Sequence, residues 1–157
     1  MPEREQYFSG SNRVNNLPQA LLLAGVFVIG LYLAFFTGLW GIVAYVLLWV
    51  ASYPIIYAGT CRYCVYYGNK CPVPLEGAYV HHFFSRSHKT FGYMQLFWAL
   101  VAYALRIFIP VIAIFLYAAY LAGLAYALVL AAFWIVHLRI TGCPNCRNVS
   151  CPLRGRS

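Results

Sequence analysis

The sequence has few charged residues and almost no acidic ones. Only 9% of its 157 residues are charged, just three residues are acidic and none is aspartate, whereas 63% are hydrophobic. A soluble domain carries about 25% charged residues, and one of this size still exposes roughly a third of its unfolded-chain surface. The shortage of charge therefore excludes a soluble globular domain, a disordered chain and, despite the net charge of +8, a nucleic-acid-binding domain. What remains is an integral membrane protein.

The missing residue types also exclude several kinds of chemistry. Without aspartate there is no Ser/His/Asp triad, no glycine-rich phosphate loop is present, and Glu76 is the only acid outside the N-terminal tail. A hydrolase with paired carboxylates is therefore excluded. Carboxylates within membrane spans usually carry protons or cations, and their absence disfavours a proton-coupled transporter or pump. Thiols and histidines are the remaining candidates for chemistry, so the sequence leans towards a non-enzymatic role.

Two long stretches without acids predict four membrane-spanning helices. The first lies between Arg13 and Arg62, and the second runs from Phe91 to Leu138 with Arg106 as its only charge. A helix needs about 20 apolar residues to cross a bilayer, so each stretch holds two helices. The expected fold is an all-α integral membrane protein with four transmembrane helices in two hairpins, each followed by a cytoplasmic cysteine knuckle. The predicted segments are an N-terminal tail at 1–16, hairpins at 17–57 and 91–140, a central loop at 58–90 and a C-terminal segment at 141–157, with the first two helices at 17–36 and 39–57.

The turn inside the second hairpin can be placed in two ways. It can fall near Arg106–Ile109, with the fourth helix starting at Pro110, or it can fall at Ala118–Gly123. We favour the first, because Arg106 then extends to the far interface and avoids the cost of roughly 3 kcal/mol for a charge near the bilayer centre. Small residues at four-residue spacing also favour one packed fourth helix, although alanine richness explains them equally well. These residues are Ala119, Gly123, Ala127 and Ala131.

The basic residues predict the orientation. All of the eleven except Arg106 lie in the N-terminal tail, in the central loop or after the fourth helix, where four spans place them on one side of the membrane. The positive-inside rule therefore predicts a multi-pass protein of the cell membrane with both termini and the central loop in the cytoplasm. The residues concerned are Arg4, Arg13, Arg62, Lys70, Arg86, Lys89, Arg139, Arg147, Arg154 and Arg156.

Two features predict partners besides the lipid bilayer itself. The end of the central loop, 77–89, interleaves aromatic residues with histidines and basic residues, which suits contact with anionic lipid headgroups. A plain basic loop that obeys the topology rule explains this segment equally well. The first helix carries Gly30, Ala34 and Gly38 at four-residue spacing, a surface for close packing within the bundle or against another membrane or cytoplasmic protein. No nucleic-acid partner is expected.

Six cysteines form two sets with matching patterns. Each set is a C-x2-C pair followed by a C-P pair, and each comes a few residues after the second helix of a hairpin. The chain therefore reads as two copies of one unit, a helical hairpin followed by a cysteine knuckle. Both knuckles are expected just outside the bilayer on the cytoplasmic side. The first set is Cys61, Cys64 and Cys71, and the second is Cys143, Cys146 and Cys151.

A metal site is the leading interpretation of these cysteines. Cytoplasmic thiols are kept reduced, so paired C-x2-C motifs favour metal ligands over disulfides. Two such pairs supply the four-thiolate tetrahedron of a structural zinc site, which would tie the second helix to the fourth. Cys71 and Cys151 are then neighbours, spare ligands or a redox pair. The four expected Zn²⁺ ligands are Cys61, Cys64, Cys143 and Cys146.

Other partitions of the cysteines stay open. Each triplet can hold its own zinc with a histidine, drawing on His81 or His82 for the first and His137 for the second. An iron–sulfur cluster can take four of the six thiolates, since a C-P pair occurs in ferredoxin-type ligation. The cysteines can also act as redox-active dithiols, form disulfides or bind nothing. If His137 is not a ligand, we expect it at the interface with a hydrogen bond to the backbone.

Three functions fit these expectations. The first is a small membrane subunit or scaffold whose cytoplasmic zinc site fixes the bundle and presents a basic face to a partner. The second is a membrane electron-transfer subunit that carries an iron–sulfur cluster or redox-active dithiols beside membrane quinone. The third, a thiol oxidoreductase, needs thiols on the oxidising side or a dedicated cytoplasmic donor. The first is our leading hypothesis.

Overall fold

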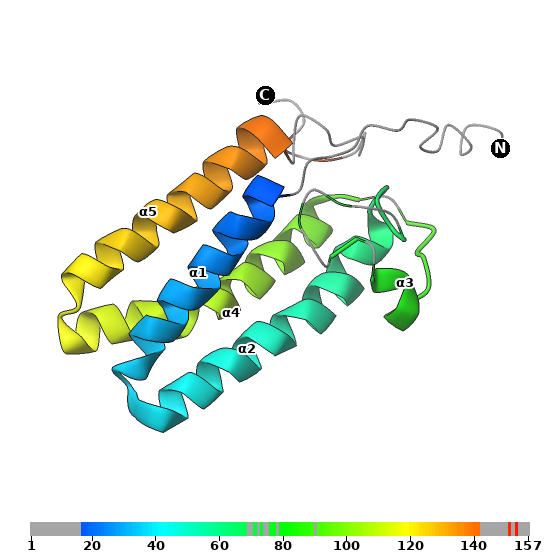
Figure 1. Cartoon of the computed structure of the whole chain (residues 1–157). Helices are drawn as coiled ribbons and strands as arrows, with labels where there is room; N and C mark the ends of the chain where they lie inside the picture. Colours follow the sequence, from blue (N-terminus) through cyan, green and yellow to red (C-terminus); the bar gives the residue numbers. More distant parts are fainter. Residues whose placement is uncertain are drawn as a thin grey trace.

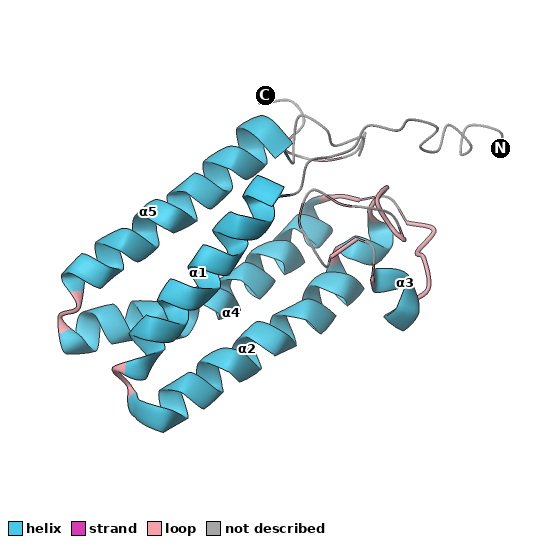
Figure 2. Ribbon diagram, viewed as in Figure 1, coloured by secondary structure: helices cyan, strands magenta, loops and turns pink. Residues whose placement is uncertain are grey.

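The computed structural model of the chain describes residues 17–68, 71, 73, 76–77, 79–89, 91–141, 151 and 153. Helices make up most of this part of the chain, and no strand occurs in it (Figure 2). Four long helices lie side by side as a bundle, and a short helix lies at one end of it (Figure 1). The long helices are α1 (Leu17–Phe35), α2 (Gly38–Gly59), α4 (Tyr93–Tyr117) and α5 (Tyr120–Val136), and the short one is α3 (Val80–Phe83).

The long helices confirm the predicted membrane fold. All four are long and apolar enough to cross a bilayer. The bounds of α1 and α2 lie close to the predicted 17–36 and 39–57. The outward faces of the four long helices carry large apolar side chains, which suits contact with lipid tails. Trp40 of α2, for example, has 83% of its surface exposed, and Leu121 of α5 has 84%. The chain is therefore all-α and built of two transmembrane hairpins.

The turn of the second hairpin lies at Ala118, beyond Pro110. Helix α4 continues through Arg106 and Pro110, and Ala118 adopts the left-handed conformation (φ 50°) that ends it. The favoured prediction was therefore wrong, and the alternative turn at 118–123 is the one observed. Arg106 does not extend to the far interface because it finds a partner inside the bundle, which removes the energetic reason for an earlier turn.

The predicted ladder of small residues does not mark a single packed face of a helix. Gly123 is buried against Ile114 of α4, whereas Ala127 and Ala131 are exposed. The ladder therefore crosses from the inner to the outer surface of α5. The alanine richness of this helix accounts for the rest of the pattern.

Helix α1 contacts each of the other three long helices, and the contact at Gly30 is tight. A side chain at Gly30 would clash with the hydroxyl of Tyr45 and lie 3.2 Å from Cγ of Pro110. That hydroxyl enters the space beside Gly30 and donates a hydrogen bond to the Phe27 carbonyl at 3.2 Å. Gly30 and Ala34 are both buried, so this part of the predicted small-residue surface packs inside the bundle.

We expect Gly30→Ala to destabilise the bundle by about 1–3 kcal/mol, because an added methyl group overpacks the contact with Tyr45 and Pro110. Unfolding by sodium dodecyl sulfate in mixed micelles measures this loss. The control is Gly92→Ala, since a Cβ there would meet its nearest neighbour at an ordinary 3.6 Å. Equal stability losses in the two variants would show that the space beside Gly30 is not tight.

Candidate functional site

The first C-x2-C pair lies on a tight turn at the end of α2. Cys61–Tyr63 form a 3-10 helix, and the Cys64 amide donates a hydrogen bond to the Cys61 carbonyl at 3.1 Å. A 3-10 helix has three residues per turn, so residues three apart lie on the same face. The local backbone therefore places the Cys61 and Cys64 side chains on one face. Cys61 is buried and Cys64 half-buried.

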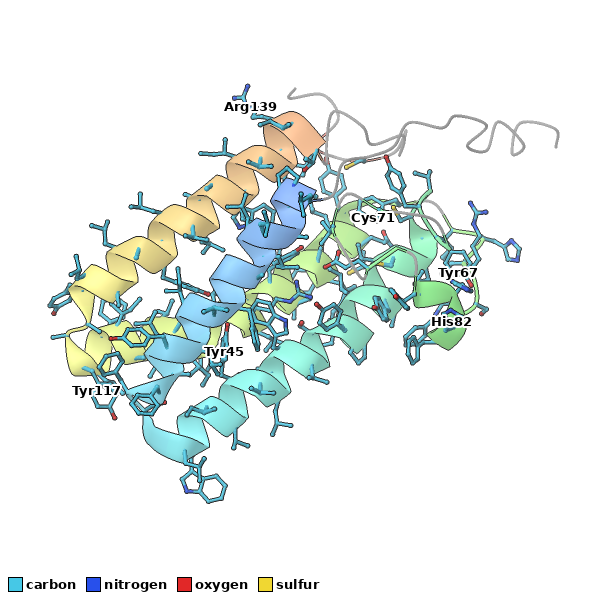
Figure 3. The ribbon with its side chains drawn as sticks, in the orientation of Figure 1. Tyr45, Tyr67, Cys71, His82, Tyr117 and Arg139 are labelled. Atoms are coloured by element: carbon cyan, nitrogen blue, oxygen red, sulfur yellow. The ribbon has the colours of Figure 1, made fainter. Side chains whose placement is uncertain are left out.

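The segment with Cys71 folds back into the bundle. The Gly68 amide donates to the Gly77 carbonyl at 2.9 Å, which closes the loop between them. Val73 is buried in the main hydrophobic core, and Cys71 packs against the same core. Figure 3 shows Cys71 at the end of the bundle where the central loop lies, opposite the end with Tyr117. Two described residues of this loop, Val73 and the acid Glu76, are therefore buried against the helices.

That acid, Glu76, forms a buried ion pair with Arg106. Nη1 of Arg106 lies 3.5 Å from Oε1 of Glu76, and the two side chains are 1% and 7% exposed. Nε of Arg106 donates a hydrogen bond to the Ser52 hydroxyl oxygen at 2.7 Å. The Tyr103 hydroxyl donates to Oε1 of Glu76 at 3.4 Å. Residues from α2, α4 and the central loop thus meet at one charged centre.

Three aromatic rings surround the Arg106 guanidinium. Its carbon lies 4.7 Å from the ring centre of Tyr53, 4.8 Å from that of Tyr103 and 5.2 Å from that of Trp49. Nη1 and Nη2 of Arg106 have no hydrogen-bond partner within the described part of the chain. Ring faces attract a cation through their quadrupoles, and the effect strengthens when water is excluded. The three rings therefore stabilise the part of the Arg106 charge that hydrogen bonds do not compensate.

The electrostatics of Glu76 depend on its partner. Burial raises the pKa of Glu76 above its ordinary range, and the Arg106 charge and the Tyr103 hydrogen bond act in the opposite direction. Burial disfavours the ionised form of a carboxyl group, and a neighbouring cation favours it. Removing Arg106 would therefore raise the pKa of Glu76 further.

Sequence reasoning missed this centre. It placed Arg106 at the far interface, treated Glu76 as an ordinary loop residue, and gave Ser52 and Tyr103 no role. One signal was available: a single charge inside a predicted span and a single acid outside the N-terminal tail. An ionisable residue within a membrane span generally pairs with another group, so these two residues were natural partners.

A second polar cluster joins the start of α1 to the end of α5. The Thr141 hydroxyl donates to Oε1 of Gln19 at 3.0 Å, and Nε2 of Gln19 lies 3.5 Å from Nδ1 of His137. Gln19 and Thr141 are buried. The side-chain partner of His137 found here is Gln19, which differs from the backbone hydrogen bond expected. The cluster holds the chain in place two residues before Cys143.

The described cysteines do not form a complete metal site by themselves. Of the described cysteines, Cys61 is buried, and Cys64, Cys71 and Cys151 are half-buried. Among the described residues, no three histidine, cysteine, aspartate or glutamate side chains gather in a way that could hold a metal ion. His81 and His82, the candidate fourth ligands of the first triplet, are both exposed. The other two predicted zinc ligands, Cys143 and Cys146, lie outside the described residues.

Comparison with protein-family models, curated proteins and solved structures finds no match to this chain. The function therefore has to follow from the geometry of the chain itself. Two features carry it: the cysteine turn at the end of α2, and the buried ion pair that holds the neighbouring loop.

Proposed function

We propose that the protein is a small multi-pass membrane subunit or scaffold whose cysteines bind one zinc ion and thereby join its two helical hairpins. The observation that carries the proposal is the 3-10 turn at Cys61–Tyr63, because it puts two thiols three residues apart on one face. This is the half-site that a four-thiolate zinc centre requires from each C-x2-C pair.

The end of α5 supports a role for the second pair. The ends of α2 and α5 lie at the same end of the bundle (Figure 1). Thr141 is fixed there by its hydrogen bond to Gln19, and Cys143 follows within a chain reach of about 7 Å. Tyr103 connects the two regions, since it contacts Glu76 of the central loop and packs its ring 5.1 Å from that of Trp134 in α5.

Metal analysis of protein purified without oxygen tests the proposal. We expect about one zinc per chain and no visible absorbance, since a closed four-thiolate site holds a single colourless ion. A brown protein with iron and sulfide would reject zinc and support the electron-transfer function. Protein that contains no metal under these conditions would reject the metal site altogether.

The orientation is part of the same proposal, because reduced thiols require the cytoplasmic side. The basic residues favour both termini inside. A reporter that is active only outside the cytoplasm, fused after Ser157, should therefore give no signal. The same reporter placed in the turn at Ala118 should be active. A strong signal from the C-terminal fusion would reverse the orientation and remove the argument for metal over disulfides.

A further inference from the structure

The guanidinium group of Arg106 has more hydrogen-bond donors than its surroundings use. Its Nε donates to the Ser52 hydroxyl, but Nη1 and Nη2, which carry four N–H groups, have no hydrogen-bond acceptor in the described part of the chain. The side chain is 1% exposed. Buried donors without an acceptor are costly, and a bound ion or water is a common reason for them. The charged centre therefore has unused capacity for a group that accepts hydrogen bonds.

Glu76 is a loose partner for this guanidinium. Its Oε1 lies 3.5 Å from Nη1 of Arg106, whereas a hydrogen-bonded pair of guanidinium and carboxylate is separated by about 2.7–2.9 Å. Glu76 also belongs to the central loop, whereas Ser52 lies on α2 and Arg106 on α4. The carboxylate can therefore leave Arg106 while the helices that form the rest of the centre stay in place.

The side chains that would remain suit a small anion. The ring faces of Trp49, Tyr53 and Tyr103 attract the guanidinium and hold it in position. The Tyr103 hydroxyl donates to Oε1 of Glu76 at 3.4 Å, and it would donate to an anion in the same place. The space filled by the Glu76 carboxylate limits the ligand to a group of similar size. The single charge of Arg106 matches one negative charge, so a carboxylate fits better than a dianion.

A proton has to accompany the anion. As long as the displaced carboxyl group remains buried, one cation does not balance two anions in the interior. Burial raises the pKa of Glu76 above its ordinary range, which favours uptake of a proton from solvent. The other titratable side chains that interact electrostatically with Glu76 are Tyr57, Cys61 and Tyr103. None of these three is a cation, so Glu76 and the incoming anion compete for the charge of Arg106.

We propose that Arg106 binds a small monovalent carboxylate in place of Glu76, and that Glu76 takes up one proton from solvent as the ligand binds. The centre then holds one cation, one anion and a neutral carboxyl group, so its total charge is unchanged. The sequence disfavoured proton-coupled activity because no predicted span contains a carboxylate, but Glu76 reaches Arg106 from the central loop. Ionisable groups inside a membrane bundle generally mark ion or proton sites. This function does not depend on the metal site.

Unfolding of Glu76→Gln in mixed micelles tests the site with formate as the probe. Glutamine has nearly the shape of the protonated acid but cannot balance the charge of Arg106, so an anion has no competitor in this variant. We expect sodium formate to stabilise the variant progressively, as a ligand that binds only the folded state does. Sodium chloride at equal ionic strength should stabilise it much less, because chloride lacks the two oxygen atoms that can receive Nη1 and Nη2 together.

The wild type supplies a test that needs no substitution. Above the pKa of Glu76, each anion that binds brings one proton, so the apparent Kd for formate should rise about tenfold per pH unit. The Kd of Glu76→Gln should not change with pH, because glutamine does not titrate. The stabilisation by formate at each pH gives these Kd values.

Two further variants separate the site from surface charge. Glu76→Gln/Arg106→Met lacks both members of the buried pair and should not respond to formate. Lys89→Ala, which lacks an exposed charge, should respond like the wild type. A wild-type Kd that does not change with pH, or equal stabilisation of Glu76→Gln and the double variant, would overturn the proposal. Equal effects of chloride and formate would also overturn it, because the site would then show no preference for carboxylates.

Discussion

Glu76→Ala is expected to destabilise the folded bundle by about 3–5 kcal/mol, because it leaves Arg106 charged and without its counter-ion in the interior. The three aromatic rings and the Ser52 hydroxyl remain, but none of them carries a negative charge. Unfolding in mixed micelles measures the loss. Lys89→Ala is the control, since this exposed charge should change stability by no more than about 0.5 kcal/mol.

The double variant Glu76→Gln/Arg106→Met gives a sharper result. Replacing both members of a buried pair by neutral groups of similar size is often close to neutral for stability. We therefore expect the double variant to be more stable than either Glu76→Gln or Arg106→Met alone. The wild type, these two single variants and the double variant together give the coupling energy of the pair. A Glu76→Ala variant as stable as the wild type, or strictly additive losses, would show that the ion pair does not hold the loop to the bundle.

Cys64→Ser and Cys146→Ser are expected to lose nearly all bound zinc. A remnant of three thiolates leaves an open coordination position and binds structural zinc far more weakly than a complete set. Metal-to-protein ratios measure the effect, and the ratio should fall from about one to near zero.

Cys71→Ser and Cys151→Ser are the matched controls and should keep the metal. Cys71 packs against the main hydrophobic core, and it is separated in the sequence from the turn that presents Cys61 and Cys64. Equal losses of metal in all four serine variants would reject the single zinc site. They would favour a cluster or two sites that use all six cysteines, and the electron-transfer function would then come first.

The number of long helices and the limits of α1 and α2 could be predicted from sequence because the bilayer imposes one simple requirement. About 20 apolar residues are needed for each span, and local composition satisfies that condition segment by segment. The C-x2-C pair at Cys61 and Cys64 is visible in the sequence itself, and the metal site inferred from it stays a prediction.

The charged centre could not be predicted in this way because its parts are far apart in the chain. Glu76 and Arg106 lie 3.5 Å apart in space, but each looks unpaired when it is judged by its sequence neighbours. Because the sequence shows no partner for Arg106, an early turn was favoured in the second hairpin. The predicted end of α4 was therefore too early. Ser52 and Tyr103 resemble ordinary helix residues until the fold brings them to Arg106.

The ion pair also decides which way the helices face. Lipid tails are as apolar as leucine, so burial of apolar side chains does not fix the rotation of a helix about its own axis. In the observed rotational setting of α4 against α2, Arg106 contacts both Glu76 and Ser52, and a rotation of α4 about its axis would separate it from them. The charge pair thus helps to fix the rotation of α4 against α2, together with the close packing at Gly30. In the double variant we expect the helices to stay associated, whereas the rotation of α4 against α2 is no longer fixed by the ion pair.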